Sequence, residues 1–386
     1  MKFIDLEAQQ VRVRDLMEKG IQQVLDHQQF IMGPEIGRLE ETLARYVGSP
    51  HAVGCGSGTD ALLLALMAFD VGPGDAVLTT PFTFIATAEV IALLGATPVF
   101  VDIEPETFNL DPEALAGTLQ ALQSGKPGPV PSAGDRRPPV PKGVIAVDLF
   151  GIPADYERIT AVAEDAGLFV LEDAAQSFGA ARRGRRCGSF GAVAATSFFP
   201  AKPLGCCGDG GMCFTADADL AGRMQSLRVH GQGKHRYEHL RIGINGRLDT
   251  LQAAVLLAKF TIFSDEIERR GAVARNYGRL LRERSIPLRT PVVPEGVTPA
   301  WAQYSVLAED SGHRARCREA LHAAGIPTAV YYPVPLHLQP AFAFLEYRKG
   351  RFPVSEATAE RIFSLPMHPY LSEEDQQRIA EVLAAV

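Results

Sequence analysis

The chain has 386 residues, of which 46% are hydrophobic, and a formal net charge of −7 at pH 7. This length and composition are typical of a globular protein with a sizeable core and two or three domains. They exclude a basic nucleic-acid-binding protein and a membrane-spanning one, because there is no cationic excess and no apolar run long enough to cross a bilayer. Asp5 and Glu7 stand where a signal peptide would be apolar, so we expect a cytoplasmic chain that binds neither nucleic acid nor membrane.

The first chemical signal is a glycine-rich turn. Spaced apolar residues predict a helix over residues 5–27 and a second one that begins at Pro34. A short strand over residues 52–55 then runs into Gly-Ser-Gly-Thr, after which the apolar spacing becomes helical. Free N–H groups at a helix start can hold an anion, so Gly58 and Thr59 are candidates for a phosphate site, with simple helix capping as the alternative.

The middle of the chain alternates strands and helices. Strands are predicted over residues 76–79, 98–102 and 144–148, with helices over 111–122 and 155–166. Phe82 follows the first of these strands and is a candidate to stack on a planar ring, although a core phenylalanine is the alternative. The proline- and glycine-rich segment at about 124–142 is expected to be a surface loop without a catalytic part. The alternation predicts a mostly parallel sheet covered by helices on both faces.

A carboxylate and a lysine follow two later apolar runs. Asp173 comes after the buried strand that begins at Leu168, and Lys202 follows Ser197 on a loop that contains Pro200 and Pro203. A lysine that forms a Schiff base and a carboxylate that keeps a pyridine nitrogen protonated are the two residues that pyridoxal phosphate requires. The alternatives are a helix-capping aspartate and a solvated lysine.

The last third of the chain predicts a second unit. A long helix begins after Asp249, followed by a strand near residues 301–307, a helix over 314–324 and a final helix from Ser372. We therefore expect a large domain over residues 1–250, and a linking helix with a small α+β domain over residues 251–386. The six cysteines show no C-x-x-C spacing, and the histidines between residues 230 and 239 lack a ligand spacing, so no metal site is predicted.

Several segments together resemble one family. GSGTDAL, PFTFIATAE, EDAAQSFGA, TSFFPAKPLGCCGDGG and NGRLDTLQAA are similar to segments of the DegT/DnrJ/EryC1/StrS nucleotide-sugar aminotransferases. The resemblance covers nearly the whole chain apart from the proline-rich segment. It implies the aspartate-aminotransferase architecture of fold type I and pyridoxal 5'-phosphate as cofactor.

The resemblance also implies roles for the candidate residues. Lys202 would form the Schiff base and shuttle the proton, and Asp173 would pair with the pyridine nitrogen. Gln176 would support the phenolic side of the ring, and Phe82 would stack on it. Gly58, Thr59 and Ser197 would hold the phosphate, while Asn245 would reach it from the neighbouring subunit of a homodimer with shared active sites.

The implied substrates are L-glutamate, which would leave as 2-oxoglutarate, and a nucleotide-linked keto sugar. The chain most resembles members that aminate UDP-2-acetamido-2-deoxy-3-oxo-D-glucuronate at C3 for O-antigen or another surface polysaccharide. Arg247, Tyr331 and Tyr332 match sugar-facing positions, and an arginine suits a carboxylate. Tyr331 replaces a histidine of those members, and Gly246 replaces a serine. A dTDP-linked 3-oxo-6-deoxyhexose therefore stays open as the acceptor, as does a non-catalytic cofactor-binding sensor, whereas the family's dehydratases resemble this chain with histidine in place of Lys202.

Overall fold

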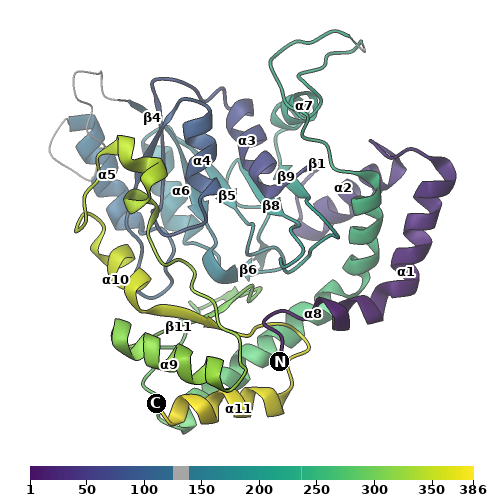
Figure 1. Cartoon of the computed structure of the whole chain (residues 1–386). Coiled ribbons are helices and arrows are strands. Elements are labelled where there is room, and N and C mark those ends of the chain that lie inside the picture. The colour runs from purple at the N-terminus through teal and green to yellow at the C-terminus, as the bar shows by residue number, and fades with distance from the viewer. Residues whose placement is uncertain (125–138, 236) are drawn as a thin grey trace.

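Figure 1 shows the computed structural model of the chain, which describes residues 1–124, 139–235 and 237–386. Helices surround a central sheet, and a smaller group of elements lies below it. The prediction of a surface loop at about 124–142 falls mainly outside the described residues.

The central sheet has seven strands in the order β1-β9-β8-β5-β4-β2-β3. β9 is antiparallel to both of its neighbours, whereas β8, β5, β4, β2 and β3 are parallel to one another. The predicted α/β fold with a mostly parallel sheet is therefore confirmed. The strands are β1 (His51–Cys55), β2 (Asp75–Thr79), β3 (Thr97–Phe100), β4 (Val140–Val147), β5 (Phe169–Asp173), β8 (Val193–Ser197) and β9 (Gly211–Thr215).

Both faces of this sheet are buried because successive side chains of a strand point to opposite sides. Val77, Ile145 and Leu171 pack in a cluster with α3, α4 and α7, while Leu78 and Val170 pack on the other face with α2, α5, α6 and α8. The apolar strands of the sequence, which lack polar alternation, reflect this two-sided cover. The helices are α2 (Pro34–Val47), α3 (Gly58–Ala68), α4 (Ala86–Leu93), α5 (Pro112–Ser124), α6 (Tyr156–Asp165), α7 (Ala218–Leu227) and α8 (Thr250–Glu283).

The long helix α8 joins the sheet to the C-terminal elements. Its first half contributes Leu256 and Phe263 to the core on the sheet, and its second half contributes Tyr277 and Leu281 to a separate core. Because α8 belongs to both cores, we keep the division into residues 1–250 and 251–386 as a proposal. The second core is formed with β11 (Tyr304–Leu307), β12 (Ile362–Leu365), α9 (Ser311–Ala323) and α11 (Glu373–Ala384), next to which lies α10 (Pro353–Arg361).

The first helix, α1 (Leu6–His27), packs Val13 and Met17 against Val255 and Ala258 of α8. A small three-stranded sheet of β6 (Ala181–Arg182), β7 (Arg185–Arg186) and β10 (Val297–Thr298) was not predicted, because two-residue strands carry no periodic pattern. Among the described residues, no helix combines the length and the apolar character that crossing a membrane requires.

Candidate active site

The candidate residues gather at one edge of the sheet. β5 ends at Asp173, β8 ends at Ser197 and β1 ends at Cys55, and Gly211 pairs with both Ser197 and Cys55. This edge contains the carboxyl ends of the parallel strands, which is where open α/β sheets bind their ligands.

Asp173 is a buried carboxylate held by two donors. The Thr87 hydroxyl donates to Oδ2 over 2.8 Å, and the Ala175 N–H donates to Oδ1 over 3.2 Å. Burial raises the pKa of Asp173, while these two hydrogen bonds and the nearby Lys202 act in the opposite direction. Thr87, which the sequence analysis did not single out, also lies 3.2 Å from the Thr83 hydroxyl. The carboxylate is therefore fixed in place and ready to pair with a cation.

Lys202 lies on the turn that follows β8. Its backbone N–H donates to the Phe199 carbonyl over 2.8 Å, which fixes the turn. Burial lowers the pKa of the amine, and the charge of Asp173 opposes that shift. Within the described part of the chain, no group accepts a hydrogen bond from this amine. A partly buried amine without an acceptor is available for chemistry.

A cradle for an anion lies at the start of α3. Ser57 caps the helix by accepting from the Asp60 N–H over 3.0 Å, and the N–H groups of Gly58 and Thr59 have no acceptor among the described residues. A Cβ on Gly58 would come within 2.6 Å of the Ser197 Cβ. The structure therefore brings the three predicted phosphate residues together, and the positive end of the helix dipole faces the space between them.

Replacing Gly211 by alanine should destabilise the protein by about 1–3 kcal/mol, because the added Cβ would lie 2.2 Å from the Ser57 carbonyl oxygen, an overpacked position that the backbone must relieve. Thermal unfolding of the cofactor-free protein measures this loss. Gly222→Ala is the control, since a Cβ there meets nothing within 4 Å on α7 and should stabilise the helix slightly. Equal melting temperatures for the two variants would contradict the close approach of β9 to this helix start.

Gln176 connects two segments that are far apart in the chain. Its Oε1 accepts from the Phe150 N–H over 2.8 Å, which leaves Nε2 to donate to the Tyr332 hydroxyl over 3.2 Å. Burial raises the pKa of Tyr332, and the charge of Asp173 adds to that rise. Tyr331 lies beside Phe3, with ring centroids 6.4 Å apart. The structure therefore places Tyr332 near Asp173 and Gln176, with Tyr331 adjacent to it in the chain.

The stacking prediction for Phe82 is wrong. Its side chain is 0% exposed and packs edge-on to Phe108 and Tyr332, so neither face of the ring is free for a ligand. Phe84, in the same loop, is 56% exposed and directly follows Thr83, whose hydroxyl lies near Thr87. Of these two aromatic residues, Phe84 is the one with an accessible ring.

Asn245 and Arg247 lie beside the helix start of the same chain. The Gly56 N–H donates to the Gly246 carbonyl over 3.0 Å, which aligns this segment with the end of β1. Asn245 is exposed, whereas the Nε of Arg247 is buried and has no hydrogen-bond partner among the described residues. A buried guanidinium nitrogen is normally paired, so its partner would be an ordered water, a ligand or a second chain.

The site fits pyridoxal phosphate by its donor set. It combines an amine without an acceptor, a buried carboxylate and a helix start with free N–H groups, and the fold that holds them is fold type I. These features define the class of the protein as a pyridoxal-phosphate-dependent enzyme.

Comparison with known proteins gives the family. The model of the DegT/DnrJ/EryC1/StrS aminotransferase family matches residues 12–384. The chain is 46% identical over 371 residues (96% of both chains) to the UDP-2-acetamido-2-deoxy-3-oxo-D-glucuronate aminotransferase of Pseudomonas aeruginosa. It is 41% identical over 381 residues (99% of this chain, 96% of the other) to the UDP-N-acetyl-3-dehydro-alpha-D-glucosamine 3-aminotransferase of Acidithiobacillus ferrooxidans.

A crystal structure of a DegT DnrJ EryC1 StrS aminotransferase from Brucella abortus is 47% identical, covers 100% of this chain and 99% of its own, and has a TM-score of 0.92. The chain belongs to the DegT/DnrJ/EryC1/StrS aminotransferase family. It is an enzyme that transfers an amino group to a nucleotide-linked sugar.

Proposed function

We propose that the enzyme moves the amino group of L-glutamate to the C3 ketone of UDP-2-acetamido-2-deoxy-3-oxo-D-glucuronate, and that the product enters O-antigen or another surface polysaccharide. The transfer chemistry is supported mainly by Asp173 and Lys202, which lie close enough to shift each other's pKa. The choice of sugar is supported by the 46% identical relative, whose name states this substrate.

When bound, pyridoxal phosphate supplies an electron sink that stabilises negative charge on the carbon bearing the amino group. Asp173 would keep a proton on the ring nitrogen through a charge pair, and the Thr87 hydroxyl holds the carboxylate in place for that role. Gly58, Thr59 and Ser197 would hold the phosphate, and Phe84, whose ring is exposed, would be available to pack on the cofactor ring. Gln176, fixed by the Phe150 N–H, supports the phenolic side.

Lys202 would hold the cofactor covalently, and its Nζ, once free, would move a proton. An amine accepts a proton only when neutral, and burial lowers the pKa of Lys202 toward the working pH. The rate should therefore fall as the pH drops through that lowered pKa, because the amine becomes protonated.

The sugar pocket is assigned to Arg247, Tyr331 and Tyr332. The unpartnered Nε of Arg247 suits a carboxylate, which accepts two parallel hydrogen bonds from a guanidinium. Tyr331 can donate a hydrogen bond to the same carboxylate, but its hydroxyl also suits a neutral sugar. The alternative acceptor is therefore a dTDP-linked 3-oxo-6-deoxyhexose.

Steady-state rates with separate acceptors test the choice of sugar. We expect kcat/KM for the UDP-linked 3-oxo-uronate to exceed that for a UDP-linked neutral 3-oxo sugar and for a dTDP-linked 3-oxo-6-deoxyhexose. Arg247→Gln should lower kcat/KM for the uronate by about 10- to 100-fold, the loss typical of one charged hydrogen bond, and leave the neutral sugars nearly unchanged. A preference for the dTDP sugar in the unmodified enzyme would move the function to deoxysugar synthesis without affecting the aminotransferase assignment.

We also propose a homodimer in which Asn245 reaches the phosphate of the partner's site. Large apolar side chains are exposed on three segments, and such exposure is a usual sign of a subunit interface. The segments are the one bridged to Asp249, the lysine loop, and the loop between α7 and α8 that projects from the body in Figure 1 and precedes Asn245 in the chain. These residues are Phe30, Ile31, Met32, Phe199, Tyr237, Leu240 and Ile242.

Mixing two defective subunits tests the shared site. Lys202→Ala and Asn245→Ala chains, refolded together, should regain about a quarter of wild-type activity, since half of the dimers are mixed and each mixed dimer has one intact site. Each variant alone gives the baseline. A mixture no more active than the average of the two would show that Asn245 serves the site of its own chain.

We keep the cytoplasm as the proposed location. All six cysteines are free thiols, including the exposed Cys207, which suits a reducing compartment.

A further inference from the structure

A second cavity lies at the opposite end of the sheet from the candidate active site. It has a volume of about 470 Å³, within the range of small-molecule sites, and it is lined by the turn between α2 and β1, the loop after β7 and the end of β9. His51 and Thr215 pair at this end of the sheet, whereas Cys55 and Gly211 pair at the active-site end. Four residue steps of extended strand separate the two ends by about 14 Å.

Three arginines and no acidic residue line this cavity: Arg45, Arg185 and Arg186. Among the described residues, none of the three has a carboxylate partner. Arg182 of the same hairpin differs from these three arginines, because it pairs with Asp155 over 2.8 Å and with Glu157 over 2.6 Å. The positive charge beside the cavity is therefore left without a counterion from the described residues.

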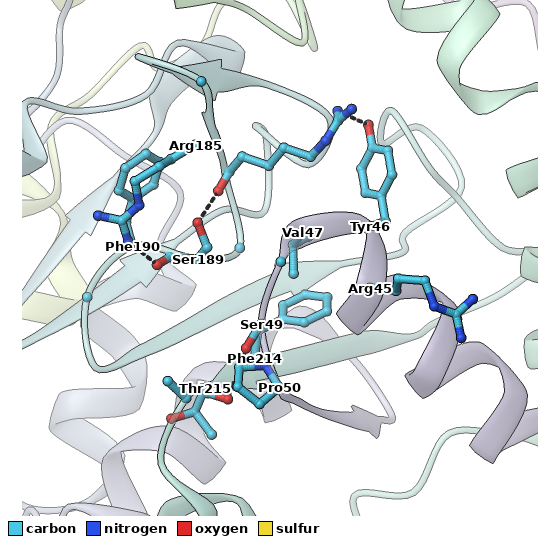
Figure 2. Close-up of a pocket in the computed structure, with 16 residues that line it drawn as sticks. Arg45, Tyr46, Val47, Ser49, Pro50, Arg185, Ser189, Phe190, Phe214 and Thr215 are labelled. Carbon is cyan, nitrogen blue, oxygen red and sulfur yellow. Dashed lines mark hydrogen bonds between the residues drawn. The ribbon is translucent and has the colours of Figure 1, made fainter.

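Two of these guanidinium groups are held in place by aromatic rings. Arg185 lies 4.8 Å over the Phe190 ring and donates to the Ser189 carbonyl over 2.7 Å. Arg186 lies 4.1 Å over the Tyr46 ring and donates to the Tyr46 hydroxyl over 2.8 Å. Figure 2 shows Arg185 and Phe190 on one side of the pocket, and Tyr46 and Arg45 on the other. The two stacked cations therefore lie at opposite rims of the cavity, Arg185 beside Phe190 and Arg186 beside Tyr46.

The loop that follows Arg186 is anchored by hydrogen bonds to a buried side chain. The buried carboxyl group of Glu172 accepts from the Gly188 N–H over 2.7 Å and from the Phe190 N–H over 2.8 Å. The C-terminus of α2 adds a negative partial charge at Gly48 of about half an elementary charge, which is smaller than the charge of the arginines. The net field in the cavity is positive, and its donors are largely preorganised.

We propose that this cavity binds a phosphate-type polyanion, drawn by the guanidinium groups of Arg185 and Arg186 at its rims. A guanidinium matches the geometry of phosphate oxygens, and cations without a carboxylate partner suit a ligand that carries at least two negative charges. Free inorganic diphosphate and the diphosphate of a nucleotide share this chemistry. The site is separate from the cofactor phosphate cradle.

Calorimetric titration of the cofactor-loaded enzyme with inorganic diphosphate and with UDP tests the proposal. At low salt, diphosphate should bind the wild type, and Arg185→Gln/Arg186→Gln should weaken that binding about a hundredfold, the product of two charged hydrogen bonds. Arg183→Gln is the matched control, because Arg183 is exposed and adjacent, approaches Glu157 at 3.8 Å and does not line the cavity. Tighter binding of UDP than of diphosphate at the same arginines would identify a nucleotide as the ligand. Weaker binding of UDP would identify free diphosphate, and equal binding would show that the site recognises the diphosphate group alone.

A second variant keeps the proposal testable if the double variant fails to fold. Arg45→Glu reverses an exposed charge at the rim and should also weaken diphosphate binding, with an unchanged melting temperature. The proposal is overturned if diphosphate does not bind the wild type at low salt, or if it binds the double variant as tightly as the wild type.

Discussion

Replacing Lys202 by alanine should lower kcat by about 10⁴-fold or more, because the variant loses both the nucleophile that attaches the cofactor and the base that moves the proton. The amine has no acceptor within the described part of the chain, and its pKa is lowered by burial, so no other contact explains its place in the site. The measurement is the steady-state rate of 2-oxoglutarate formation, together with the visible absorption of the covalently held cofactor. Both should disappear.

Lys349→Ala is the matched control, since Lys349 is an exposed lysine that pairs with Glu360 at 3.4 Å. That variant should keep the wild-type rate. Cofactor added in excess should still bind the Lys202 variant through the phosphate cradle, without a covalent bond. A Lys202→Ala enzyme that retained more than about a tenth of the wild-type rate would remove this residue from the chemistry.

Replacing Asp173 by asparagine should lower kcat by about 150- to 5,000-fold. Asparagine keeps the size of the side chain and can still accept from the Thr87 hydroxyl, but it cannot hold a positive charge on the ring nitrogen. Removing one member of a buried charge pair typically costs 3–5 kcal/mol, roughly, which corresponds to this range of rates. The rate and the affinity for the cofactor should both be measured.

Thr87→Val distinguishes the negative charge of Asp173 from the hydrogen bond that holds its carboxylate in place. It removes the 2.8 Å hydrogen bond to Asp173 but leaves the carboxylate in place, so we expect only about a tenfold loss. It should also raise the pKa of Asp173 further, because that hydrogen bond acts against the rise caused by burial. If Asp173→Asn lost no more activity than Thr87→Val, the negative charge of Asp173 would have no catalytic part.

Much of this fold can be predicted from the sequence, because strands buried on both faces form continuous apolar runs. Segments with the apolar spacing of helices separate these runs. The positions of Asp173 and Lys202 follow from the same pattern, since residues after parallel strands meet at one edge of the sheet. The choice between Phe82 and Phe84 does not follow from the sequence. Two aromatic residues in an irregular loop share no period, and only the packing of Phe82 against Phe108 shows which ring is enclosed.

Thr87 carried a weaker signal that could have been found. It lies four residues after Thr83, near the start of α4, and its hydroxyl contacts both the Thr83 hydroxyl and Asp173. The partners of Gln176 could not have been found in this way. Phe150 and Tyr332 are 26 and 156 residues away in the chain, and only the folded structure brings them to the same side chain.

The most direct test of the central claim follows the nitrogen atom. The cofactor-loaded enzyme is incubated with nitrogen-labelled L-glutamate and the UDP-linked 3-oxo-uronate, and the sugar product is analysed by mass spectrometry. We predict one labelled nitrogen at C3 of the sugar and one molecule of 2-oxoglutarate for each sugar aminated. Failure of glutamate to yield 2-oxoglutarate, or an unlabelled sugar product, would contradict the proposed transfer from glutamate to the nucleotide sugar.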